Sequence, residues 1–115
     1  LRAEALTANT SVLTCLANDV GYTKIFSEQL KVKASKNDLL IVLSGSGNSE
    51  NVVEALKVSN ELGLKTFAIL GFTGGRCKEF AQHHIHFEIN DMQIVEDLQL
   101  VVGHMCLQWL STRTI

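Results

Sequence analysis

Hydrophobic and polar positions along the chain fall into blocks that suit strands and helices in turn. One unbroken apolar run and one largely apolar segment are bounded by polar residues or glycine, and their length and lack of helical spacing are typical of buried strands. A later segment of similar length is expected to form one more strand of the same sheet. The predicted strands are 39–43, 64–70 and 84–89, with residues 3–8 as the end of a further strand.

Between these runs, apolar residues recur every three or four positions, as in helices with one buried face. In the clearest case Val53 and Leu56 share a stripe, and Gly63 follows as a stop signal. The last helix carries apolar residues around most of its circumference, so both of its sides must be covered. The predicted helices are 10–18, 23–34, 49–62, a short one from 74 or 75 to 81, and 92–112.

Strands that alternate with helices predict right-handed crossovers and a parallel sheet with helices on both faces. We therefore expect an α/β fold, a three-layer sandwich formed as one domain over residues 1–115. In sheets of this kind, ligands bind beyond the carboxyl ends of the strands. Candidate site residues should therefore follow the strands directly.

The segment that follows the first long apolar run has the strongest chemical signal. We call residues 44–49, Ser-Gly-Ser-Gly-Asn-Ser, the serine loop. Its glycines allow a tight turn, and its hydroxyl and amide groups lie beside the unpaired N–H groups of the next helix, which favours a bound phosphate. A simple helix cap is the alternative, but a cap needs only one such side chain. The loop lacks the lysine of a P-loop and the third glycine of a dinucleotide motif, so a nucleotide is the weaker hypothesis.

Composition narrows the class of protein. The 115 residues are 46% hydrophobic and 19% charged, an ordinary balance for one globular domain. A net charge of −2 provides no electrostatic attraction for nucleic acid or an anionic membrane. No apolar run reaches the roughly 18 residues of a membrane span and no signal peptide opens the chain, so we expect a cytoplasmic protein. The three cysteines are too widely spaced for a metal knuckle and are expected to be reduced thiols.

The sequence leaves open the roles of two pairs of basic or titratable residues outside the serine loop. Arg76 and Lys78 follow a Gly-Gly pair and either bring positive charge near the loop or begin a solvated helix. His84 and His86 would share a face of a strand and could ligate a metal. No cysteine or second cluster completes a tetrahedral ligand set there, and a solvated sheet edge is the alternative.

The serine loop resembles the phosphosugar-binding loop of the sugar isomerase (SIS) domain. The flanking segments 10–22 and 25–29, the glycine-rich stretch 71–75 and the last helix resemble the phosphoheptose isomerase branch of that family. The resemblance implies a Rossmann-like sandwich. It also implies that residues 1–115 are a partial SIS domain, which lacks the usual N-terminal helices and first strand.

The resemblance also implies roles for individual residues. His104 matches the catalytic histidine, which acts as a general acid or base, while the family's partner glutamate and a further glycine-rich loop lie upstream of the segment matching Leu1. Asn9 stands where the family usually has aspartate, and Glu96 where it usually has a glutamine that lines the site. Glu96 and His104 are also the possible zinc ligands, although the reaction requires no cofactor. The implied phosphosugar-binding residues are Ser44, Ser46, Asn48, Ser49, Asn9 and Glu96.

These roles predict a phosphosugar isomerase that interconverts a ketose and an aldose phosphate of the sedoheptulose 7-phosphate class. The alternative is a non-catalytic phosphosugar-binding or scaffolding module, which the family also contains. The expected partners are a phosphorylated sugar and further copies of the chain, in a tetramer that the family favours, with no nucleic acid and no membrane. The apolar helix 92–112 is expected near the subunit interface or the site.

Overall fold

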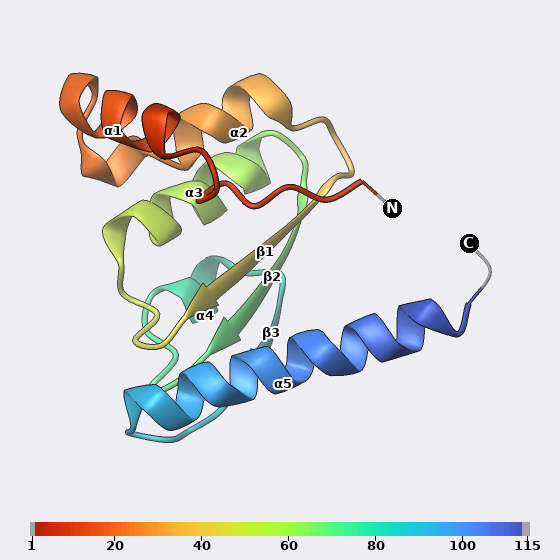
Figure 1. The fold of residues 1–115 in the computed structure, drawn as a ribbon. Coiled ribbons are helices and arrows are strands. Elements are labelled where there is room, and N and C mark those ends of the chain that lie inside the picture. The colour runs from red at the N-terminus through yellow and green to blue at the C-terminus, as the bar shows by residue number, and fades with distance from the viewer. Residues whose placement is uncertain (1, 114–115) are drawn as a thin grey trace.

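The fold of the computed structural model, which describes residues 2–113, is a three-stranded parallel sheet with helices on both faces (Figure 1). The strands are β1 (Leu39–Ser44), β2 (Lys65–Leu70) and β3 (His83–His86), and they lie in the order β1-β2-β3. In the register, Leu39 pairs with Lys65 and Phe67 pairs with His83. The predicted α/β sandwich with a parallel sheet is confirmed.

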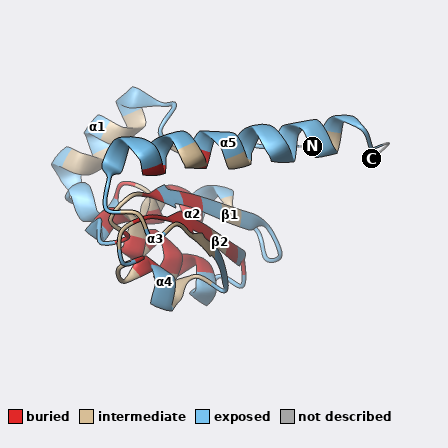
Figure 2. Ribbon diagram, turned by 90° about the horizontal axis from the view of Figure 1, so that it is seen from below, coloured by how far each residue is buried: buried red, intermediate tan, exposed pale blue. Residues whose placement is uncertain are grey.

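The helices are α1 (Thr10–Asp19), η1 (Tyr22–Lys24), α2 (Ser27–Lys33), α3 (Glu50–Glu61), α4 (Cys77–Phe80) and α5 (Met92–Ser111). A short 3-10 helix, η1, connects α1 to α2, so the single helix predicted over 23–34 is in fact two elements. Helices α3 and α4 pack on one face of the sheet, α2 packs against α3, and α5 crosses the other face (Figures 1 and 2). None of those formed by residues 2–113 combines the length and apolarity needed to cross a bilayer.

The hydrophobic core lies between α3 and the sheet, where Figure 2 shows the buried residues concentrated. Val53 and Leu56 of α3, which share the predicted stripe, are 1% and 0% exposed. They pack with Val42 of β1 and Leu70 of β2. Because each large apolar side chain contributes about 1.5–3 kcal/mol when fully buried, this cluster anchors α3 firmly behind the strands.

The strand predicted at 3–8 does not form, because the segment makes a turn in which Ala8 N donates to the Ala5 carbonyl at 3.0 Å, and it does not pair with β1. It lies across a groove of about 1230 Å³ from β1, and the groove is lined on one side by residues 2–7 and on the other by 39–43. The segment is held by a 3.1 Å hydrogen bond from the Gln29 side chain to the Leu6 carbonyl and by an ion pair between Lys33 and Glu4. The third predicted strand also ends early, at His86, because the following chain turns and Phe72 donates to the Ile89 carbonyl.

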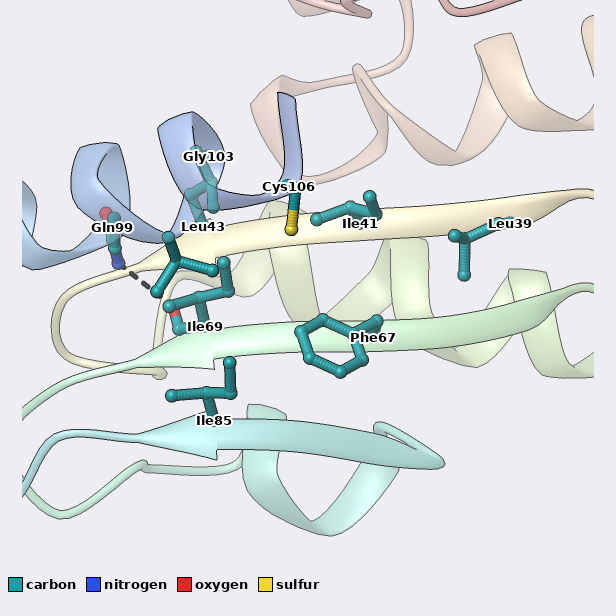
Figure 3. Close-up of a pocket in the computed structure, with 10 residues that line it drawn as sticks. Leu39, Ile41, Leu43, Phe67, Ile69, Ile85, Gln99, Gly103 and Cys106 are labelled. Atoms are coloured by element: carbon teal, nitrogen blue, oxygen red, sulfur yellow. Dashed lines mark hydrogen bonds between the residues drawn. The ribbon is translucent and has the colours of Figure 1, made fainter. Parts of the chain in front are cut away.

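The sheet face beneath α5 is largely open. Leu39, Ile41 and Leu43 are 55–58% exposed, although their unbroken apolar run predicts burial. Only Val95 and Gln99 of α5 are buried, and Gln99 donates to the Ile69 carbonyl at 2.9 Å. Between α5 and the strands is an apolar cavity of about 520 Å³ (Figure 3). The prediction that another surface must cover α5 is therefore not met by residues 2–113 themselves.

Candidate functional site

The serine loop leaves the carboxyl end of β1 and leads into α3, as the sequence predicts. Ser49 is the N-cap residue of α3 in extended conformation, yet its side chain makes no capping hydrogen bond. The first N–H groups of any helix lack an intrahelical partner. Val52 N already donates to the Asn51 side-chain oxygen at 2.9 Å, so the exposed Ser49 hydroxyl and the N–H groups of Glu50 and Asn51 are the donors at the positive end of the α3 dipole, which suits an anion.

Two other serines shape the loop from within. The hydroxyl oxygen of Ser44 is buried and accepts a hydrogen bond from Gly47 N at 3.1 Å. That of Ser46 accepts one from Asn48 N at 3.2 Å. Because a hydroxyl that accepts a bond still has its own proton to donate, both serines can support the turn and bind a ligand oxygen.

A second loop, residues 71–76 between β2 and α4, holds the serine loop in place. Gly71 N donates to the Gly45 carbonyl at 2.9 Å, and Cys77 N donates to the Gly47 carbonyl at 2.8 Å. Arg76 N donates to the side-chain oxygen of Asn48 at 3.1 Å. Sequence reasoning assigned Asn48 to the loop but missed this partnership, for which the dense glycines of 71–75 are the available signal.

The close approach of the two loops depends on Gly47. Its φ is +69°, and a Cβ atom added there would lie 2.0 Å from the Gly74 carbonyl oxygen. Only glycine accepts both the left-handed backbone and this contact. The geometry therefore explains the second glycine of the serine loop by packing between loops as well as by turning.

Helix α5 begins beside the serine loop and then leaves it. A Cβ added to Gly45 would lie 2.3 Å from the Met92 sulfur, which shows how closely the first turn approaches. Glu96, one turn further on, is exposed. His104 is also exposed, and at 1.5 Å per residue it lies about 18 Å from Met92 along the axis. It also points about 160° away from Cys106, which faces the sheet cavity.

The structure thus brings together four of the predicted site residues, Ser44, Ser46, Asn48 and Ser49, in one loop. Within one chain it does not bring His104 to that loop. Asn9 lies at the start of α1, where its side-chain oxygen accepts from Val12 N at 3.1 Å and caps the helix. The binding roles of these residues remain predictions.

No group of three metal-ligating side chains is close enough together to hold an ion within residues 2–113. Glu96 and His104 are separated by about 12 Å along one helix, so they cannot share a zinc ion within one chain. The ring nitrogens of His86 are occupied, with Nε2 2.9 Å from the Phe72 carbonyl and Nδ1 3.2 Å from the Lys78 amine. The possible zinc site is therefore not confirmed.

Two cysteines have thiols that resist ionisation. Burial raises the pKa of Cys77 to about 11. A hydrogen bond to the Asp19 carboxylate raises the pKa of Cys15. Since the thiolate is the reactive form of cysteine, neither residue suits the role of a nucleophile.

Comparison with known proteins assigns a family to this arrangement. Residues 1–71 match the family described as the SIS domain. The chain is 41% identical over 104 residues to a phosphoheptose isomerase of Aliarcobacter butzleri, covering 90% of the chain and 55% of that protein. It is 39% identical over 105 residues to one of Akkermansia muciniphila, covering 91% and 56%. The chain therefore spans about half the length of the curated relatives it matches.

Solved structures agree with the fold. A phosphoheptose isomerase from Neisseria gonorrhoeae superposes with a TM-score of 0.95 at 28% identity, covering 98% of this chain and 63% of that one. Another, from Francisella tularensis, has a TM-score of 0.94 at 23% identity, with the same coverage. Sheet and helices of this chain are thus arranged as in those two proteins.

Proposed function

Because the chain belongs to the SIS domain family, we propose that it is the phosphosugar-binding part of a phosphoheptose isomerase. The observation that carries the proposal is the serine loop, with the free Ser49 hydroxyl at the N-terminus of α3. Relatives at 41% and 39% identity that are named phosphoheptose isomerase support it. The proposed reaction interconverts a ketose and an aldose phosphate of the sedoheptulose 7-phosphate class.

In this proposal the phosphate lies against the serine loop. Ser46 and Ser49 donate hydroxyl protons to it, together with the first N–H groups of α3, while Ser44 and Asn48 keep the loop in shape. A hydrogen bond to a charged group contributes about 1.5–3 kcal/mol. A few such bonds and the helix dipole are enough for a phosphate dianion without a P-loop lysine.

The proton transfer requires an acid or base that the serine loop does not contain. Isomerisation moves a proton between adjacent carbons and others between their oxygens, so two titratable groups are needed. We assign one role to His104, although it faces away from the loop of its own chain. A second group would come from the part of the relatives' length that this chain does not span. No step of the proposal uses a metal ion.

The proposed role of His104 requires more than one copy of the chain, because the residue lies away from the serine loop of its own chain. Leu100, Met105 and Leu107 on the same helix are 60–65% exposed, an apolar surface that is large for a monomer. We propose that α5 packs at the interface of a homo-oligomer, a tetramer by family resemblance, which brings His104 of one copy toward the serine loop of another. The three free cysteines suit a cytoplasmic location, which is part of the proposal.

The domain boundary is also part of the proposal. The groove is lined on one side by residues 2–7 and on the other by β1, whose outer edge pairs with no strand among residues 2–113. These features support a partial SIS domain in which a further strand would fill the groove.

Binding and turnover of sedoheptulose 7-phosphate by the full-length protein test this proposal. Ser49→Ala should weaken binding about 10- to 100-fold, the loss of one charged hydrogen bond, while Ser11→Ala on the exposed face of α1 leaves it unchanged. His104→Gln should lower kcat about 10²–10⁴-fold with binding intact, because glutamine cannot exchange a proton near neutral pH. Binding without turnover would support the non-catalytic module instead. If His104→Gln keeps its turnover, the assignment of proton transfer to His104 is wrong.

A further inference from the structure

An ion pair lies at the rim of the serine loop, between the Arg76 guanidinium and the Glu50 carboxylate. We propose that Arg76 sets the anion affinity of the loop by neutralising Glu50. This inference rests on the proposed function, since it assumes that a phosphate binds at the serine loop. It goes further by naming a residue outside the loop that determines how tightly the phosphate is held.

Glu50 is an obstacle to phosphate binding at this position. It is the first residue of α3, directly after Ser49, so its carboxylate is attached to the helix end that would receive the phosphate. A carboxylate there interacts favourably with the helix dipole, but it repels a phosphate dianion. The negative charge of Glu50 must therefore be balanced for the site to bind strongly.

Arg76 is held in the right place to balance it. Its backbone N–H donates to the Asn48 side-chain oxygen at 3.1 Å, which ties the residue to the serine loop. The Asn48 amide in turn donates to the Ser46 carbonyl at 3.2 Å, so the tie continues into the turn itself. From this anchor the guanidinium reaches Glu50, 26 residues away in the sequence.

The neighbouring lysines are directed elsewhere. Lys78 lies 3.2 Å from the His86 ring nitrogen, and Lys57 lies over the Phe80 ring at 5.0 Å from its centroid. Among residues 2–113, Arg76 is thus the basic residue that pairs with a carboxylate at the start of α3. Because the pair is partly exposed, with side-chain exposures of 41% and 63%, its effect should be moderate and should weaken as salt is added.

A double-mutant cycle with inorganic phosphate as the probe tests the inference. In the full chain at low salt, Arg76→Gln should weaken phosphate binding roughly five- to tenfold, because it leaves the Glu50 carboxylate unpaired beside the anion. Glu50→Gln should bind at least as tightly as the wild type. The double variant Arg76→Gln/Glu50→Gln should return to within about twofold of the wild type, since the repelling charge is also gone.

A matched surface pair serves as the control for the loss of an ion pair. Lys31→Gln breaks a comparable pair with Glu28 on α2 and should leave phosphate affinity unchanged. Thermal unfolding of each variant shows whether the fold is intact, and added salt should shrink the effect of Arg76→Gln. A double variant as weak as Arg76→Gln would mean that Arg76 contacts the phosphate directly and would overturn the inference. So would a normal affinity in Arg76→Gln. A wild type that binds no phosphate would overturn both the inference and the proposed function.

Discussion

Replacing Gly47 with alanine tests whether the serine loop is shaped by its contact with the second loop. The new Cβ would lie 2.0 Å from the Gly74 carbonyl oxygen, and the residue would keep a φ of +69°. The left-handed backbone costs about 1–2 kcal/mol for alanine. Overlap with a backbone atom adds about 1–3 kcal/mol because the second loop must move. We expect Gly47→Ala to lower the free energy of unfolding by about 2–5 kcal/mol.

Gly63→Ala is the matched control. Gly63 has a similar φ of +75°, but an added Cβ would meet only the flexible Lys36 side chain, at 3.3 Å. Gly63→Ala should lower the free energy of unfolding by about 1–2 kcal/mol, the cost of the left-handed backbone alone. Urea unfolding followed by circular dichroism measures both variants, and phosphate titration should show affinity lost in Gly47→Ala and retained in Gly63→Ala. Equal destabilisation by the two substitutions would refute the argument from loop contact.

Two further predictions concern buried polar groups behind the site. The free energy of unfolding should fall by about 1–3 kcal/mol between pH 9 and 11. The pKa of Cys77 is raised to about 11 in the folded protein, so in that range its thiol ionises mainly in the unfolded chain. Chemical denaturation of Cys77→Ala should lack this part of the pH dependence. Thr66→Val should destabilise the fold by about 1–3 kcal/mol, because the fully buried hydroxyl accepts from Gln82 N at 2.9 Å; Thr66→Ser, which keeps the hydroxyl, should lose less in urea titrations.

Local patterns in the sequence predicted the regular elements well, for physical reasons. Helix α3 has a clear stripe, a serine at its start and Gly63 at its end, and the structure matches it within one residue. The same rules failed at residues 3–8, where a strand-like pattern ends in a turn and lies across a groove from β1. They also overstated the burial of β1, because an apolar run does not reveal that Ile41 faces an open cavity. Pairing and covering depend on distant segments, which a local pattern does not contain.

In the candidate site, too, local features could be predicted and contacts between distant segments could not. The residues within the serine loop could be predicted because glycine, serine and asparagine before a helix have local chemistry of their own. The tie between Asn48 and Arg76 could not, because it joins residues 28 apart and forms only when β1 and β2 are side by side. The place of His104 relative to the loop depends on the direction of α5, and helical spacing alone does not determine it.

The order of events in refolding follows from the tethers between the two loops. The bonds that Gly71, Arg76 and Cys77 make to the serine loop can form only after β2 has joined β1 and the chain has turned into α4. Closing a stretch of that length costs entropy before any contact is made, whereas α3 can form locally. Anion affinity should therefore appear among the last properties that a refolding molecule acquires. A phosphate ligand would then slow unfolding more than it speeds folding, because it binds only the finished loop.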